Sequence, residues 1–193
     1  MIARILSGLF LTATLVLPVE AAIFSTTLSG DQEVPPVNSA ATGSASLILN
    51  EAQDRLEIDI QFTGLDLDGN QTPATDDNVT QAHIHRAPPG STGPVVFGFI
   101  NPSNDLNGDL VIDPVAGMIS SGWDLNEGNN TTLAAELPNL FDGDLYVNIH
   151  SAEFLNGEIR GQIALVPIPA TLPMFAVALA ALGLGSWRAR KAF

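Results

Sequence analysis

Residues 22–165 are predicted to form one all-β domain, an antiparallel β-sandwich or barrel. In residues 56–62 apolar side chains alternate with Glu57, Asp59 and Gln61, which is the two-residue period of a strand with one wet face. Similar short runs recur between glycine-rich turns, a pattern typical of sandwiches and barrels. The length fits a single domain. The chain has no cysteine, so disulfides and thiolate metal ligands are excluded.

The strands are expected in a regular series along the domain. Their predicted ranges are 23–28, 45–49, 56–62, 79–85, 95–100, 145–149 and 158–165. Turn-forming sequences separate them, namely S29-G-D, T63-G, D68-G-N, P88-P-G, S120-S-G, D142-G-D and N156-G. Residues 130–140 are expected to contain one or two helical turns.

The first 21 residues are predicted to be a secretory signal peptide. Arg4 precedes an apolar run over residues 5–17, and small residues follow at Val19 and Ala21. This order is that of a signal peptide, with cleavage after Ala21. The alternative is an N-terminal membrane anchor, which the short apolar run disfavours because a spanning helix needs about 20 residues.

The C-terminal end is predicted to contain a transmembrane helix. An apolar segment over residues 172–187 is followed by Arg188, Arg190 and Lys191, which the positive-inside rule holds on the cytoplasmic side. A buried helix of the globular domain is the alternative. The membrane interpretation leaves residues 22–165 outside the cytoplasm.

The residues V166-P-I-P-A-T-L-P-M-F175, with the apolar segment and the basic tail, resemble a PEP-CTERM sorting signal in its V-P-x-P-A variant. Val166, Pro167, Pro169 and Ala170 carry this resemblance, and Ile168 stands where the commoner form has glutamate. The resemblance implies a bacterial exported protein that an exosortase-type enzyme processes. It also implies a location in the cell envelope or extracellular matrix, with at least transient anchoring in the inner membrane.

The predicted domain is strongly acidic. It holds 20 of the 21 acidic residues of the chain against Arg55, Arg86 and Arg160, a net formal charge of −17. Such a surface repels nucleic acid and attracts cations or basic partners. Solubility, or adaptation to a salty medium, would also account for it.

All three histidines of the chain are candidate metal ligands. His83 and His85 share one face of their predicted strand with Gln81, and His150 shares the outer face of its strand with Tyr146 and Asn148. If the two strands are neighbours, three imidazoles converge as a ligand set for zinc or copper with an open fourth position. Alternatively, the histidines form a half-buried hydrogen-bonded layer with Glu158 and Arg160.

The histidine segments also carry a family resemblance. The ordered blocks are L28-S-G-D-Q-E-V-P-P36, A82-H-I-H-R86, G90-S-T-G-P-V-V96, D144-L-Y-V-N-I-H-S151 and G157-E-I-R-G-Q162. Together they resemble the CHRD domain over residues 24–164, with Glu158 and Arg160 in the last block. The resemblance implies an extracellular β-rich module without a defined biochemical activity.

Two loops contain alternating side-chain oxygens, D66-L-D-G-N70 and N104-D-L-N-G-D109. Such loops suit either calcium ligation or ordinary Asx turns. Neither has the EF-hand spacing. The sequence has no nucleophile elbow, phosphate loop or Ser/His/Asp signature.

Three functions follow as hypotheses. The first is a non-enzymatic structural or binding module of the envelope or matrix, which contacts extracellular polysaccharide. The second is a zinc or copper protein, with a metalloenzyme as one form of it, although a binuclear copper–zinc site needs more than the three histidines present. The third is a protein-binding module whose acidic face meets a basic partner.

Overall fold

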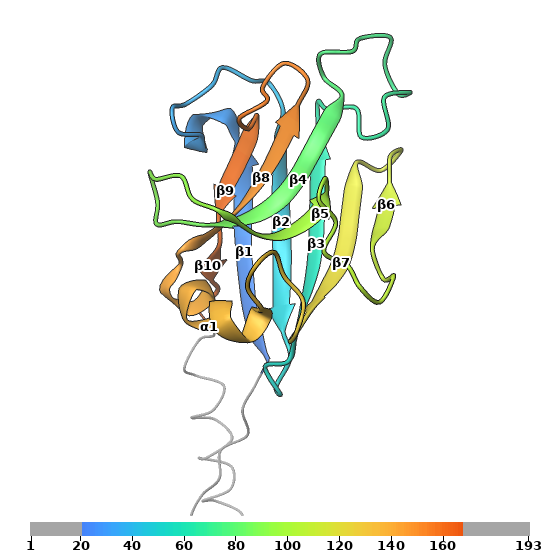
Figure 1. Ribbon diagram of the computed structural model, residues 1–193. Coiled ribbons are helices and arrows are strands. Elements are labelled where there is room, and N and C mark those ends of the chain that lie inside the picture. Colours follow the sequence, from blue (N-terminus) through green and yellow to red (C-terminus); the bar gives the residue numbers. More distant parts are fainter. Residues whose placement is uncertain (1–20, 168–193) are drawn as a thin grey trace, which may run out of the picture.

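The computed structural model describes residues 21–167, and these form one curled antiparallel sheet of ten strands. The strand order is β5-β4-β8-β9-β1-β2-β3-β7-β6, with the short β10 paired to β1. The sheet bends into a half-barrel whose edges are β5 and β6 (Figure 1). The all-β, antiparallel prediction is confirmed, and one continuous sheet builds the fold.

The strands and helices follow the chain in order. They are β1 (Ala22–Ser29), the 3-10 helix η1 (Gly30–Gln32), β2 (Thr42–Leu49), β3 (Arg55–Thr63), β4 (Val79–Arg86), β5 (Val95–Ile100), β6 (Val111–Asp113), β7 (Met118–Asp124), α1 (Leu133–Asp142), β8 (Leu145–Ser151), β9 (Ile159–Gln162) and β10 (Ala164–Leu165). Every predicted strand is present. The predicted strand 158–165 is divided into β9 and β10.

The hollow of the half-barrel is filled by the apolar side chains that alternate along the strands. In β3 the four apolar side chains are buried and the intervening polar side chains are exposed. Trp123 of β7 stacks on Phe97 of β5 with ring centroids 5.0 Å apart. β5 is one edge strand of the sheet, and β7 lies next to the other edge strand. The two strands do not pair, so this side-chain contact covers the core between them.

The prediction of a turn at S120-S-G is wrong, because these residues lie inside β7. Gly122 belongs to the strand for a steric reason. A Cβ atom there would lie 2.1 Å from a guanidinium nitrogen of Arg55, so glycine leaves room for Arg55 to cross the strand. Arg55 then forms ion pairs with Asp109 at 2.7 Å and Asp124 at 2.8 Å.

Helix α1 begins and ends at capping residues. The Thr132 side chain accepts a hydrogen bond from the Ala135 amide at 3.3 Å, and Gly143 adopts the left-handed conformation at φ 76°. Both are standard helix ends. The helix lies beside the point where the described chain begins and ends (Figure 1), and the predicted helical turns are confirmed as this longer helix.

Within residues 21–167 no helix is long and apolar enough to cross a membrane. The predicted C-terminal helix falls outside the described residues, and so does the predicted signal peptide except for Ala21. Val166 and Pro167 of the sorting motif are described. The Val166 amide donates a hydrogen bond to the Ile23 carbonyl at 2.8 Å, so the two ends of the domain are side by side.

Candidate metal centre

The three histidines lie on two neighbouring strands. β4 pairs directly with β8, and Gln81 faces His150 while His83 faces Asn148 across the ladder. The inner side chains, Ala82 and Ile84, belong to the core. The expected assignment of the histidines to the outer face is therefore confirmed, and so is the strand adjacency that convergence requires.

The outer face of β8 is shielded from solvent. All seven residues of this strand are buried. Three loops cover the face, and each contributes a backbone carbonyl to one histidine. His83 Nε2 is 2.8 Å from the Asn101 oxygen, His85 Nδ1 is 2.9 Å from the Gly93 oxygen, and His150 Nδ1 is 3.0 Å from the Leu155 oxygen.

These contacts fix which nitrogen of each neutral ring carries the proton. A carbonyl oxygen only accepts, so the bonded nitrogen must donate its N–H and the other nitrogen keeps a lone pair. The three remaining nitrogens are His83 Nδ1, His85 Nε2 and His150 Nε2. All three are buried and lack a hydrogen-bond partner.

The lone-pair nitrogens converge. The ring centroids of the histidines are 5.3 Å, 5.5 Å and 6.0 Å apart, and one potential ligand atom from each lies within 4.8 Å of the others. Metal–imidazole bonds are about 2.0–2.1 Å long, so two nitrogens bound to one ion are at most about 4.2 Å apart, and the three rings would draw closer together on binding. The arrangement fits zinc or copper.

The electrostatics keep the histidines neutral. Burial lowers the pKa of all three, and it lowers that of His85 to about 4, with smaller contributions from the neighbouring imidazoles and Arg160. Only a neutral imidazole can bind a metal ion. The backbone carbonyls behind the rings match the usual outer contacts of metal-bound histidine, which orient the ring and fix its tautomer.

Tyr146 connects the histidines to Arg160. The Tyr146 ring stacks on His85 with centroids 4.9 Å apart, and the Arg160 guanidinium carbon lies 3.6 Å from the centre of the same ring. Arg160 donates to the Ser91 carbonyl at 2.7 Å and to Gln162 at 3.1 Å. This buried cation thus holds the β4–β5 loop over the histidines.

Glu158 serves a different loop. One of its carboxylate oxygens accepts a hydrogen bond from the Ser39 hydroxyl at 2.6 Å. Within residues 21–167 neither Glu158 nor Arg160 forms a hydrogen bond with a histidine. The histidines are hydrogen-bonded to backbone carbonyls, and Arg160 is linked to them through the Tyr146 ring and not by a direct hydrogen bond.

Sequence reasoning did not identify Glu33 as a residue of this region. Glu33 follows η1 and is buried, with one carboxylate oxygen lacking a hydrogen-bond partner. The only signal was its place in the block L28-S-G-D-Q-E-V-P-P36. The backbone carbonyls of Gly93, Asn101 and Leu155, which accept hydrogen bonds from the histidines, could not be predicted from the types of these residues.

The two oxygen-rich loops are Asx turns. One Asp66 carboxylate oxygen accepts from the amides of Asp68, Gly69 and Asn70, and the other accepts from Gln71 and Thr72. Asp105 accepts four amides in the same way. Because these oxygens already face backbone donors, the loops favour the Asx-turn interpretation over calcium ligation.

Comparison with known families agrees with the fold and the motif blocks. The CHRD domain model matches residues 24–163, a range that includes all three histidines, Glu158 and Arg160. No curated protein and no solved structure matches the chain significantly. Because the match covers well over half of the sequence, the chain belongs to the CHRD domain family.

Proposed function

We propose that this protein is an exported, non-enzymatic binding module that holds a zinc or copper ion at His83, His85 and His150. The convergence of three imidazoles, each with one buried nitrogen that lacks a hydrogen-bond partner, carries the proposal. Buried polar atoms normally have a partner, and three unpartnered acceptors in one place call for a cation. Membership of the CHRD family agrees with a binding or structural module.

The ion would have a structural role in the sheet. His83 and His85 belong to β4 and His150 to β8, so one ion would fasten two strands in addition to their backbone ladder. Each ligand is also held by a different covering loop. A bound ion would therefore order the loops that form this face of the molecule.

The place of action that we propose is the bacterial envelope or extracellular matrix. This part of the proposal is supported by the resemblance of the N-terminal residues to a signal peptide and of residues 166–193 to an exosortase sorting signal. Extracellular polysaccharide or a basic protein would be its contacts there. The acidic surface favours the basic protein.

The test is the metal content of the full chain, purified without a histidine tag and offered zinc and copper separately. We expect about one ion per chain, measured by mass spectrometry, and a rise in melting temperature, because an ion that binds only the folded state stabilises it. The double variant His83→Ala, His85→Ala should lose both effects. The matched control is Gln81→Ala, on the same face of β4.

Retention of less than a tenth of an ion per chain by the folded wild-type protein, after exposure to both metals, would refute the metal site. Equal metal content in the wild-type protein and the double variant would also refute it, since the ion would then bind elsewhere. Circular dichroism of each variant establishes that its sheet is intact.

A further inference from the structure

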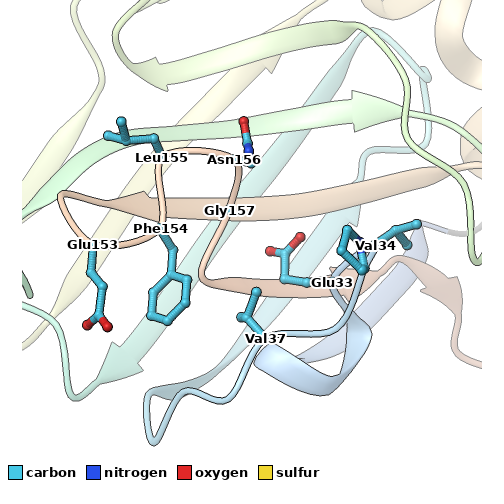
Figure 2. A pocket seen from close by; sticks show the side chains of 9 residues that line it. Glu33, Val34, Val37, Glu153, Phe154, Leu155, Asn156 and Gly157 are labelled. Atoms are coloured by element: carbon cyan, nitrogen blue, oxygen red, sulfur yellow. The ribbon is translucent and has the colours of Figure 1, made fainter.

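A cavity lies beside the histidine face, between the segment after η1 and the loop that joins β8 to β9. Its volume is about 370 Å³. Its walls are mainly apolar, with Val34, Pro35 and Val37 from one segment and Phe154 and Leu155 from the other. Figure 2 shows the Glu33 carboxylate between these two segments, pointing toward Gly157.

Glu33 is a buried acid without a matching base. It is 6% exposed, and its Oε1 atom lacks a hydrogen-bond partner. Burial raises the pKa of its carboxyl group to about 7, although the charge of Arg160, the Val34 amide and the Asn148 side-chain amide act in the opposite direction. Among residues 21–167 the ion pairs involve only Arg55 and Arg86 on the basic side, so no ion pair neutralises Glu33.

A second acceptor without a partner lies next to the first. Asn148 Oδ1 is also buried and unpaired. A Cβ atom on Gly157 would lie 2.6 Å from Glu33 Oε1, 2.6 Å from Asn148 Nδ2 and 2.7 Å from Asn148 Oδ1, so the carboxylate and the amide both lie against this glycine. Both unpaired oxygens can only accept hydrogen bonds, so a ligand that pairs with them must carry a donor group. The carboxylate of Glu33 favours a donor group with a positive charge.

We propose that this cavity binds the side chain of a lysine or arginine from a partner protein, with its charged end at Glu33 and Asn148. The aliphatic stem of such a side chain suits the apolar walls. An amino sugar would bring several hydroxyl groups against those walls, where they would lose hydrogen bonds with water. The net formal charge of −17 on residues 22–165 would attract a basic partner at long range.

This inference goes beyond the proposed metal site and does not depend on it. The cavity residues include none of the three histidines. The two sites are neighbours. The Leu155 carbonyl accepts a hydrogen bond from His150, and Asn148 faces His83 across the β4–β8 ladder. Titrations repeated after dialysis against a chelator would separate the two sites, because amine binding should survive removal of the metal.

The experiment is calorimetric titration of the full chain in detergent with short peptides that are capped at both ends. Their central residue is lysine, arginine or norleucine, and glucosamine is a fourth probe. At pH 8 and low salt we expect the lysine and arginine peptides to bind and the norleucine peptide not to bind. Binding should weaken as the salt concentration rises past about 0.15 M, because surface charges are then screened.

Two variants test the two halves of the cavity. Glu33→Gln keeps the shape and removes the charge, so it should weaken binding of the basic peptides at least tenfold. Phe154→Ala removes an apolar wall and keeps the charge, and it should also weaken binding. The control is Glu51→Gln, which removes an equal charge in the β2–β3 turn outside the cavity and should change affinity less than twofold.

Three results would overturn the proposal. One is equal binding of the norleucine and lysine peptides, which would make the cavity a simple apolar site. Another is tighter binding of glucosamine than of either basic peptide, which would assign the cavity to a polysaccharide. The third is absence of binding by all four probes to protein whose melting curve shows it to be folded.

Discussion

Glu33 should make the stability of the protein depend on pH. Its pKa is about 7 in the folded state against 4.5 for an ordinary glutamate, so the folded state binds more protons than the unfolded state between these values. Stability therefore falls as pH rises through this window. The contribution of Glu33 to this loss is roughly 1–3 kcal/mol. The lowered pKa values of His83, His85 and His150 act in the opposite direction in the same window, so the loss is measured by urea unfolding at pH 4.5 and pH 8 as the difference between the wild-type protein and a variant without the carboxyl group.

The variant Glu33→Gln isolates this contribution, because glutamine does not titrate. We expect the variant to be more stable than the wild-type protein at pH 8, and the stability difference between the two proteins to be larger at pH 8 than at pH 4.5. Arg160 and Asn148 stand beside Glu33, and neither titrates in this range. If both proteins lose the same stability, Glu33 is not the group responsible.

At the scale of single residues, the sequence predicted which face of the sheet each histidine lies on. It did not predict the loops that bury the histidines on that face. Strict alternation placed His83, His85 and His150 correctly, since period two is a local property of a strand. Their burial comes from backbone carbonyls at Gly93, Asn101 and Leu155. No residue type marks a carbonyl contact, so periodicity could not reveal it.

Helix α1 should depend on the buried carboxylate of Glu136 for its attachment. One Glu136 oxygen accepts from Arg86 at 2.8 Å and from Thr131 at 2.7 Å, and the other accepts from Asn139 at 2.8 Å. Glu136→Ala leaves these donors unpaired, so we expect a loss of about 2–3 kcal/mol in the free energy of unfolding. Chemical denaturation measures it.

The control for this prediction is Asp142→Ala, which removes an exposed acid from the last turn of the same helix. An acid near a helix C-terminus opposes the helix dipole, so this change should alter stability by less than about 0.5 kcal/mol. A loss for Glu136→Ala no larger than that for the control would show that Glu136 does not anchor the helix.

Among the elements, the strands that the sequence predicted are those with clear alternation or an apolar run. β7 was missed because Ser120, Ser121 and Gly122 look like a turn, whereas Ser121 is buried and Gly122 accommodates Arg55. β6 was missed because it has three residues, too few to show a period. β7 is defined by its pairing with β3, which is distant in sequence and which local patterns do not report, whereas β6 is the short edge strand of a hairpin with β7.

The whole molecule has its chain ends at one pole and its candidate sites away from that pole. Val166 pairs with Ile23, and the chain leaves the half-barrel beside α1 (Figure 1). The loops that line the cavity, after η1 and after β8, lie at the opposite end of the strands (Figure 1). A membrane anchor at the C-terminal end would therefore present the cavity away from the bilayer.

The sorting segment should act independently of the folded domain. Pro167 and Pro169 follow the last strand, outside the matched family region, so Pro167→Ala with Pro169→Ala should leave the melting temperature within about 2 °C. The same double variant should accumulate unprocessed in the membrane fraction of a host that has the exosortase. Immunoblots of membrane and extracellular fractions measure this accumulation.

Normal release of the variant would refute recognition of this motif. The matched control is Thr171→Ala, which is adjacent to the motif but outside it.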